Sequence, residues 1–148
     1  MTATEFFQRL CTIDREAQSL VSEAGYSFDY GFDVLPRHDP DERFILDVLT
    51  APLESLSPLH EELLYLMKPI SGEYTLERLP DGRFGYHSFP DGFLHRLVIG
   101  DTFEAKVPDC FGVPHWVRTT FDADMDGNLF LWGCGSVPLD HLTIRVRG

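Results

Sequence analysis

Hydrophobic residues recur at steps of three and four along the first 24 positions, as they do on one face of an α-helix. The residues of this stripe are Phe6, Leu10, Ile13, Ala17, Leu20 and Ala24. Thr2 and Glu5 have the spacing of a capping box at the helix start, and Gly25 supplies a stop at its end. The pattern predicts a helix of about 20 residues whose stripe packs on the protein's own sheet, with a dimer seam as the alternative.

A strand and two shorter helices are predicted next. Residues 27–34 alternate polar residues with Phe28, Tyr30, Phe32 and Val34, a pattern typical of a half-buried strand. Asp39 before Pro40 has the features of a helix cap and first turn, and this helix is expected to end at Thr50-Ala51-Pro52. Ser57 before Pro58 repeats the signal and begins a third helix, which ends by residue 72.

Beyond residue 72 the chain consists of short β-branched or aromatic runs, bounded by Gly, Pro and Asp. The runs are 73–79, 83–89, 93–99, 102–107, 115–121, 129–134 and 142–147. Pro-Asp-Gly occurs at 80–82 and at 90–92, and Asp126-Gly127-Asn128 forms a third turn signal. The run 93–99 is apolar on both faces, which predicts a central strand, and the alternation in 142–147 predicts that Arg145 and Arg147 face outward.

These patterns predict an α+β fold, in which a long N-terminal helix and two short helices pack on a mostly antiparallel, meander-like β-sheet. We expect a single domain over 1–148, mainly helical over 1–72 and mainly β over 73–148. Trp116 and Trp132 are expected to fill the core of this domain, or else to line a ligand groove or an interface.

The charge of the chain narrows the classes of partner. With 12 Lys+Arg against 24 Asp+Glu the net charge is −12, which argues against binding to nucleic acid or to an anionic membrane. Residues 1–74 hold 14 acids and 5 bases, whereas 75–148 hold 10 and 7. We therefore expect a basic protein partner, bound by acidic residues from the region before and at the second helix: Asp29, Asp33, Asp39, Asp41 and Glu42. The oligomeric state stays open.

The sequence carries no phosphate loop, nucleophile elbow or zinc-protease motif. We predict no catalytic residue, no metal and no cofactor. Three cysteines without a visible secretory leader favour the reducing cytoplasm, and no run reaches the roughly 20 apolar residues of a membrane span. The function expected is that of a small acidic cytosolic binding protein, which engages a basic protein and neutralises it as immunity or inhibitor proteins do.

Three alternatives remain. Asp122, Asp124 and Asp126 have the spacing of the first ligands of a calcium loop, but Gly133 stands where such a loop has its bidentate Glu, and a hairpin turn explains the same residues. A second alternative is a zinc site built from Cys110, His115, Cys134 and His141, whose spacing is not that of a zinc finger. The third is an enzyme that uses His38, His115 or His141 as acid and base.

Overall fold

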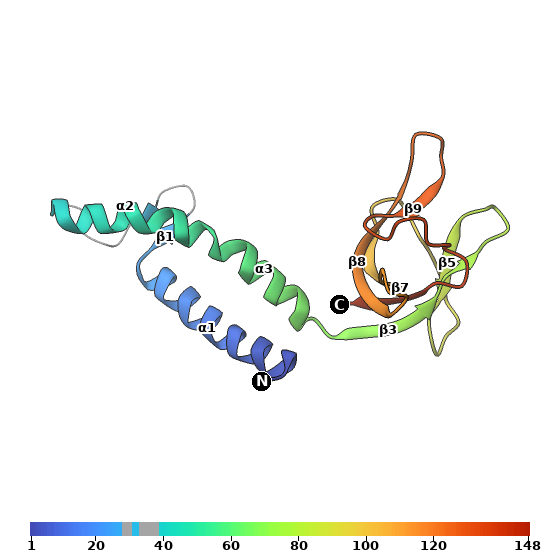
Figure 1. Ribbon diagram of the computed structural model, residues 1–148, viewed down its shortest axis with the longest axis horizontal. Helices are drawn as coiled ribbons and strands as arrows, with labels where there is room; N and C mark the ends of the chain where they lie inside the picture. Colours follow the sequence, from blue (N-terminus) through green and yellow to red (C-terminus); the bar gives the residue numbers. More distant parts are fainter. Residues whose placement is uncertain (28–30, 33–38) are drawn as a thin grey trace. The chain divides into compact units, whose positions relative to one another are not determined.

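A computed structural model describes residues 1–27, 31–32 and 39–148. The chain divides into two compact units, Met1–Met67 and Lys68–Gly148 (Figure 1). The first unit is mainly helical and the second is built of antiparallel strands, so the α+β class is confirmed. The change from helix to strand falls between 67 and 70, slightly before the expected boundary. That the two units make a single domain stays a prediction.

Helix α1 spans Ala3–Glu23 and begins and ends as its sequence predicts. The Glu5 N–H donates to the Thr2 side chain, and the Thr2 N–H donates to the Glu5 carboxylate, which completes the capping box. Ala24 is the C-cap, and Gly25 follows with a φ of 65°, a conformation that glycine adopts without strain.

The covered face of α1 is rotated from the predicted stripe. The positions that are buried or half-buried follow helical spacing: Phe7, Leu10, Cys11, Asp14, Ala17, Gln18 and Val21. Within its unit α1 contacts α3 and β1, and Asp14 turns toward α3 because its Oδ2 lies 2.7 Å from His60 Nδ1. Phe6, Ile13 and Leu20 remain 53%, 61% and 67% exposed. The prediction that the whole stripe is covered is therefore wrong for these three residues.

Helix α2 spans Pro40–Glu54 and α3 spans Leu56–Met67. Asp39 caps α2 and Pro40 stands in its first turn, as predicted, but the helix does not end at the 50–52 break. It runs through Pro52 to its C-cap Ser55, and the Thr50 hydroxyl donates to the Leu46 carbonyl one turn earlier. Because α3 starts directly after Ser55, Ser57 lies inside that helix, and the prediction of Ser57 as its cap is wrong.

The predicted strand over 27–34 is replaced by a pair of two-residue strands. β1 is Tyr26–Ser27 and β2 is Gly31–Phe32, and they pair antiparallel with Tyr26 opposite Phe32. The chain therefore turns back on itself between β1 and β2, and the prediction of one continuous strand over 27–34 is wrong. Phe28, Tyr30 and Val34 lie outside the described residues.

The unit Lys68–Gly148 contains two antiparallel sheets. The strands are β3 Ile70–Thr75, β4 Glu77–Arg78, β5 Phe84–His87, β6 Leu94–Arg96, β7 Thr102–Pro108, β8 Pro114–Ala123, β9 Leu129–Leu131 and β10 Thr143–Arg147. The larger sheet has the order β3-β10-β7-β8-β9 and the smaller one β4-β5-β6. Successive hairpins form the meanders β4–β6 and β7–β9, as predicted, whereas β10 inserts between β3 and β7 and ties the end of the chain to the start of the unit.

The strands curl around one apolar core (Figure 1). All its buried members come from residues 76–144: Leu76, Phe84, Leu97, Phe103, Ala105, Val107, Phe121, Leu131, Cys134, Leu139, Leu142 and Ile144. Strand β6 is not the predicted central strand, because it pairs only with β5 and so forms a sheet edge. Phe93, Val98 and Ile99 from the same run are accordingly 64%, 58% and 62% exposed.

An ion-pair cluster covers the outer face of the larger sheet. Glu104 on β7 is only 4% exposed and accepts hydrogen bonds from Nε of Arg145 and, at 2.6 Å, from Nε of Arg147. The two arginines lie on the face opposite to Ile144, as predicted, but their side chains are only 18% and 12% exposed because both lie along Glu104.

Neither tryptophan belongs to the buried core. Trp132 is 57% exposed, and its Nε1 donates to Asp122 at 2.9 Å. Trp116 is half-buried on the outer face, where the Arg145 guanidinium stands 4.3 Å from its ring centroid and Lys106 Nζ 5.7 Å. Of the helices in the described part of the chain, none is long and apolar enough to cross a membrane.

Candidate protein-interaction surface

The predicted partner-binding acids that the structure describes lie at the start of α2. The Asp39 carboxylate accepts hydrogen bonds from the N–H groups of Asp41, at 2.8 Å, and of Glu42, at 3.4 Å. This carboxylate is therefore used to cap the helix, whereas Asp41 and Glu42 are exposed in the first turn. Asp29 and Asp33, the other two members of the predicted set, lie outside the described residues.

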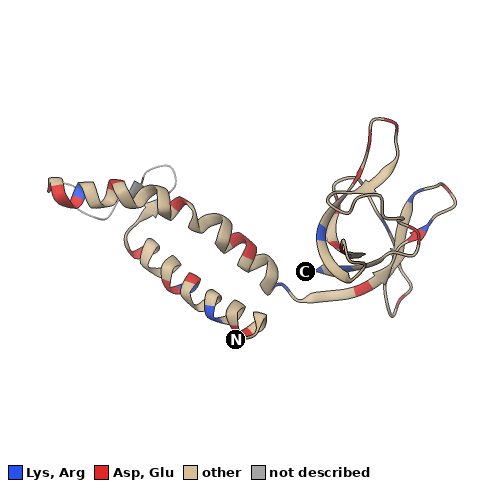
Figure 2. Ribbon diagram, viewed as in Figure 1, with Lys and Arg blue, Asp and Glu red and all other residues tan. Residues whose placement is uncertain are grey.

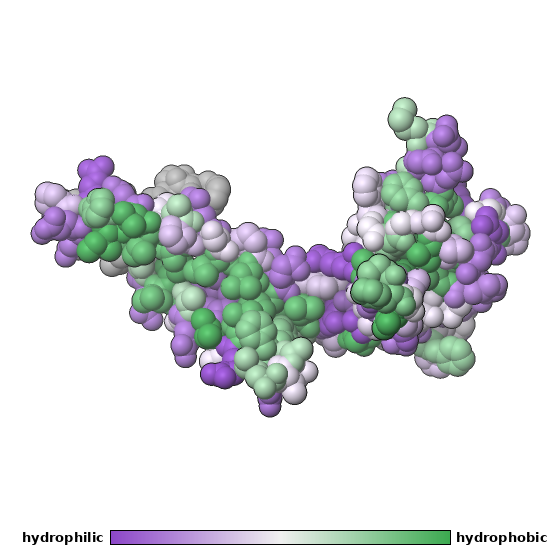
Figure 3. Space-filling model, viewed as in Figure 1, coloured by the Kyte–Doolittle hydropathy of each residue, from purple (hydrophilic) through white to green (hydrophobic). Residues whose placement is uncertain are grey.

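Helix α2 presents a row of large apolar side chains to solvent. Phe44 is 68% exposed, Ile45 and Val48 are each 54% exposed, and Leu49 is 44% exposed. We call these four residues the apolar ridge. None of the residues of α2 is buried, and Figure 3 shows hydrophobic residues gathered over this helix. Soluble domains cover most such side chains, so a continuous exposed ridge is a candidate interaction surface.

The first-turn acids share a face with the apolar ridge. Asp41 precedes Phe44 and Ile45 by three and four residues, the spacing of neighbours on a helix surface. On the opposite side of the helix Asp47 pairs with Arg43 at 3.9 Å, while within the described ranges neither Asp41 nor Glu42 has a cationic partner. The ridge therefore has an acidic N-terminal end whose charge is not neutralised by this part of the chain.

The charge of the helical unit reinforces this local arrangement. Residues 1–67 carry 13 acids against 4 bases, a net charge of −9, whereas residues 68–148 carry 11 against 8, a net charge of −3. Acidic residues occur along all three helices in Figure 2. A field of this sign attracts a cationic protein and repels nucleic acid and anionic lipid.

No family model matches this chain. No curated protein matches it either. Among solved structures the chain is similar to a protein from Ruminococcus gnavus, whose crystal structure was determined by the Northeast Structural Genomics Consortium. The two share 27% sequence identity over 51% of this chain and 100% of that chain, with a TM-score of 0.40. The name of that protein states no function.

The motif of Asp122, Asp124 and Asp126, for which a calcium loop was the alternative, forms a hairpin turn between β8 and β9, with Ala123 paired to Leu129. The Asp124 carboxylate accepts hydrogen bonds from the N–H groups of Asp126 and Asn128 and from the Asn128 side chain. These bonds, with the Asn128 side chain the largest cause, hold the pKa of Asp124 below its usual value. The hairpin interpretation of this motif is confirmed, and the Asp124 carboxylate is held by donors of the turn itself.

The residues of the proposed zinc and acid–base sites are scattered. Cys110 is exposed, whereas Cys134 is buried in the core of the strand unit. Within the described residues no group of three His, Cys, Asp or Glu side chains is placed to hold a metal ion. His115 and His141 are exposed, and His38 lies outside the described part of the chain.

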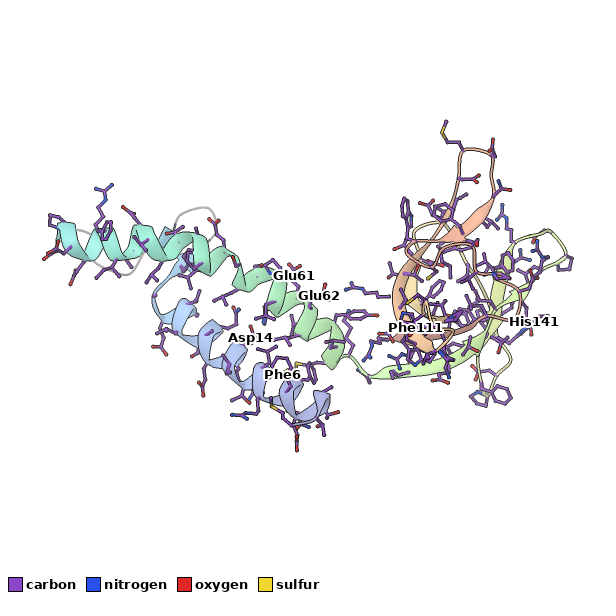
Figure 4. All side chains as sticks on the ribbon, viewed as in Figure 1. Phe6, Asp14, Glu61, Glu62, Phe111 and His141 are labelled. Carbon is purple, nitrogen blue, oxygen red and sulfur yellow. The ribbon has the colours of Figure 1, made fainter. Side chains whose placement is uncertain are left out.

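A partly buried carboxylate–histidine pair was not predicted. Asp14 is 8% exposed and lies on the side of α1 that faces α3, where its Oδ2 is 2.7 Å from His60 Nδ1 (Figure 4). A cavity of about 510 Å³ adjoins this pair and is lined by Gln18, Val21, Tyr26, Leu53, Glu54, Leu56, Ser57, Pro58, His60 and Glu61. The only sign of this pair in the sequence is Asp14, a carboxylate among the apolar positions of α1. His60 lies 46 residues further along the chain, so no local pattern connects the two residues.

The apolar ridge was not predicted as a candidate interaction surface either. Its residues were assigned correctly to a short helix, and periodicity alone implies that such a face is buried within the protein. The useful signal is the position of Asp41 among these residues, because a carboxylate at that spacing is costly on a face that packs into a core.

Proposed function

We propose that this chain is an acidic binding protein whose helix α2 docks on a basic protein and occupies its cationic site. The single observation that carries the proposal is the apolar ridge, exposed along a helix with no buried residue and bordered by Asp41 and Glu42. Apolar anchors supply most of the free energy of a protein interface, and charges at its rim select the partner and speed its approach.

The arrangement favours a helix-in-groove mode of recognition. Phe44 and Val48 are four residues apart, as are Ile45 and Leu49, so two adjacent rows of anchors can enter one groove. The matching site on the partner has an apolar floor and lysines or arginines near the N-terminal end of α2. A protein that binds a polyanion carries clustered lysines and arginines, and occupying them would exclude the polyanion, as an immunity or inhibitor protein does. We place the chain in the cytoplasm, where the exposed Cys110 thiol stays reduced.

The test is affinity capture from the native cell lysate by the immobilised full chain, eluted at low and then moderate salt. We expect the wild-type chain to retain a basic protein, identified by mass spectrometry, that moderate salt releases. Asp41→Asn/Glu42→Gln should lower its recovery about tenfold, because two charges that steer the partner are lost. Phe44→Ser removes an anchor, and a loss of about 2 kcal/mol lowers the affinity about 30-fold.

The matched control is Asp91→Asn/Asp126→Asn, which removes two exposed carboxylates from the strand unit. Its net charge therefore equals that of Asp41→Asn/Glu42→Gln. It should capture the partner as the wild-type chain does. All variants keep Asp39, so the cap of α2 is preserved, and far-UV circular dichroism checks their helix content. If both double variants recover equally little of the partner, net charge rather than α2 governs binding. If Phe44→Ser recovers as much partner as the wild-type chain, the apolar ridge is not part of the interface.

A further inference from the structure

The second exposed apolar surface of the helical unit lies on α1. Phe6, Ile13 and Leu20 stand seven residues apart and are 53%, 61% and 67% exposed. Helix α3 does not account for this face, because α3 binds the neighbouring one through the hydrogen bond of His60 to Asp14. Three large side chains at this spacing lie along one line of the helix, next to the half-buried Leu10 and Ala17.

The combined positions have the period of a coiled coil. Ala3, Leu10, Ala17 and Ala24 repeat every seven residues, and Phe6, Ile13 and Leu20 repeat with the same period three residues later. These two series are the a and d positions of a heptad, which keep a seam turned toward another helix over the whole length of α1. The face therefore matches a helical partner better than a sheet or a small ligand.

We propose that α1 pairs antiparallel with α1 of a second copy of this chain. In this register Ile13 packs on Leu10 of the second copy, Phe6 on its Ala17 and Leu20 on its Ala3. Each large side chain then meets a small or matching one, which fills the seam evenly. A parallel pair would stack Phe6 on Phe6 and leave a gap where Ala17 meets Ala17.

The charges beside the seam select the same orientation. Arg9 and Glu16 are exposed at the edge of the seam away from α3. The antiparallel register brings Arg9 opposite Glu16 of the second copy, and the two-fold axis repeats the pair. Glu23 meets the N-terminal end of the opposite helix, where a carboxylate is favourable. In a parallel pair Arg9 would need Asp14 of the second copy, which is 8% exposed and bonded to His60.

The two proposals differ in their dependence on salt. Each helical unit has a net charge of −9, so two copies repel each other and the dimer strengthens as salt screens that repulsion. Binding of a basic partner through α2 weakens over the same range. The failure of one proposal is therefore distinguishable from the failure of the other.

Sedimentation equilibrium of the full chain, at low and moderate salt, measures the dissociation constant of the dimer. We expect a dimer whose dissociation constant falls as salt rises. Ile13→Asp should raise that constant at least about tenfold and, since Ile13 is 61% exposed, leave the helix content unchanged. Arg9→Glu alone and Glu16→Arg alone should each raise it about fivefold, because each breaks two symmetry-related surface pairs, and the double reversal should restore it.

Phe44→Ser on α2 is the control and should leave the dimer intact. The proposal is overturned if the wild-type chain is monomeric at every concentration, which would mean that α1 is covered within the chain or by another protein. A dimer that Ile13→Asp does not weaken also overturns it. So does a double reversal that fails to restore affinity, because Arg9 and Glu16 would then not face each other.

Discussion

Glu104 is the least exposed charged residue that the structure describes, and it organises the ion pairs on the outer face of the larger sheet. One carboxylate, 4% exposed, accepts hydrogen bonds from two arginines of β10. Arg145 is also its cross-strand neighbour in the ladder between β7 and β10. Alternation in the sequence correctly predicted which face these arginines occupy. It could not predict their burial, because their partner lies more than 40 residues earlier in the chain.

Glu104→Leu should destabilise the strand unit by about 3 kcal/mol, because two largely buried guanidinium groups lose their counter-charge. Urea unfolding followed by tryptophan fluorescence measures this, since both tryptophans, Trp116 and Trp132, belong to this unit. The control is Glu73→Gln, an exposed carboxylate opposite Arg145 on β3, which should change stability by less than about 0.5 kcal/mol. Similar effects of both substitutions would show that burial of the pair is unimportant.

At the scale of elements, prediction succeeded where the signal is local. The capping box and Gly25 fixed both ends of α1, and Asp39 fixed the start of α2. The turn formers separated the strands in nearly the right places, with Gly82, Gly92 and Gly127 at φ values of 81°, 63° and 82°. These features depend on a few neighbouring residues, so the sequence contains the information needed.

Prediction failed where packing between elements decides. Pro52 was expected to end α2, but the helix continues past it to Glu54. The proline removes one backbone hydrogen bond of the helix, and this loss is tolerated at an exposed position. The run 93–99 was expected at the centre of a sheet, yet β6 is the edge strand of the sheet β4-β5-β6. The apolar pattern of the run contains no information about this strand order. The candidate interaction surface also combines a local signal with a non-local one. Its acidic residues were predicted from the distribution of charge along the sequence. The apolar ridge could not be predicted, because it depends on which helix faces the rest of the chain leaves exposed.

The β8–β9 hairpin yields a prediction about pH. The Trp132 indole lowers the pKa of Asp122, and Asn128 lowers that of Asp124, from an ordinary value of 3.8. A carboxyl whose pKa is lowered by folding stabilises the fold above its unfolded pKa, and this contribution is lost as pH falls through the folded value. Asp124→Ala should therefore lower the Tm at pH 7, and its difference from the wild-type Tm should shrink below about pH 4.

Thermal melts by circular dichroism between pH 7 and pH 3 test this expectation. Asp126→Ala is the control, because the Asp126 side chain accepts none of the hydrogen bonds of the turn. It should leave the Tm nearly unchanged over the whole range. A Tm difference for Asp124→Ala that is the same at pH 7 and at pH 3 would contradict the role of the ionised carboxylate.

At the scale of the whole molecule, the chain joins two units of different character. The strand unit has a core of twelve buried residues, whereas Leu63 is the one buried apolar residue among the described part of the helical unit. The helical unit also carries a net charge of −9. Exposed apolar faces of this kind are typical of interaction surfaces, which is why we propose that α1 and α2 bind partners and that the strands support them.

Amide hydrogen exchange of the full chain, alone and bound to the captured basic protein, tests the central claim most directly. Free α2 should exchange rapidly, because none of its residues is buried. In the complex, amides of Pro40–Glu54 should exchange at least about tenfold more slowly, while the strands of Lys68–Gly148 keep their rates. Unchanged exchange in α2, with new protection confined to the strand unit, would contradict docking through the acidic end and the apolar ridge of α2.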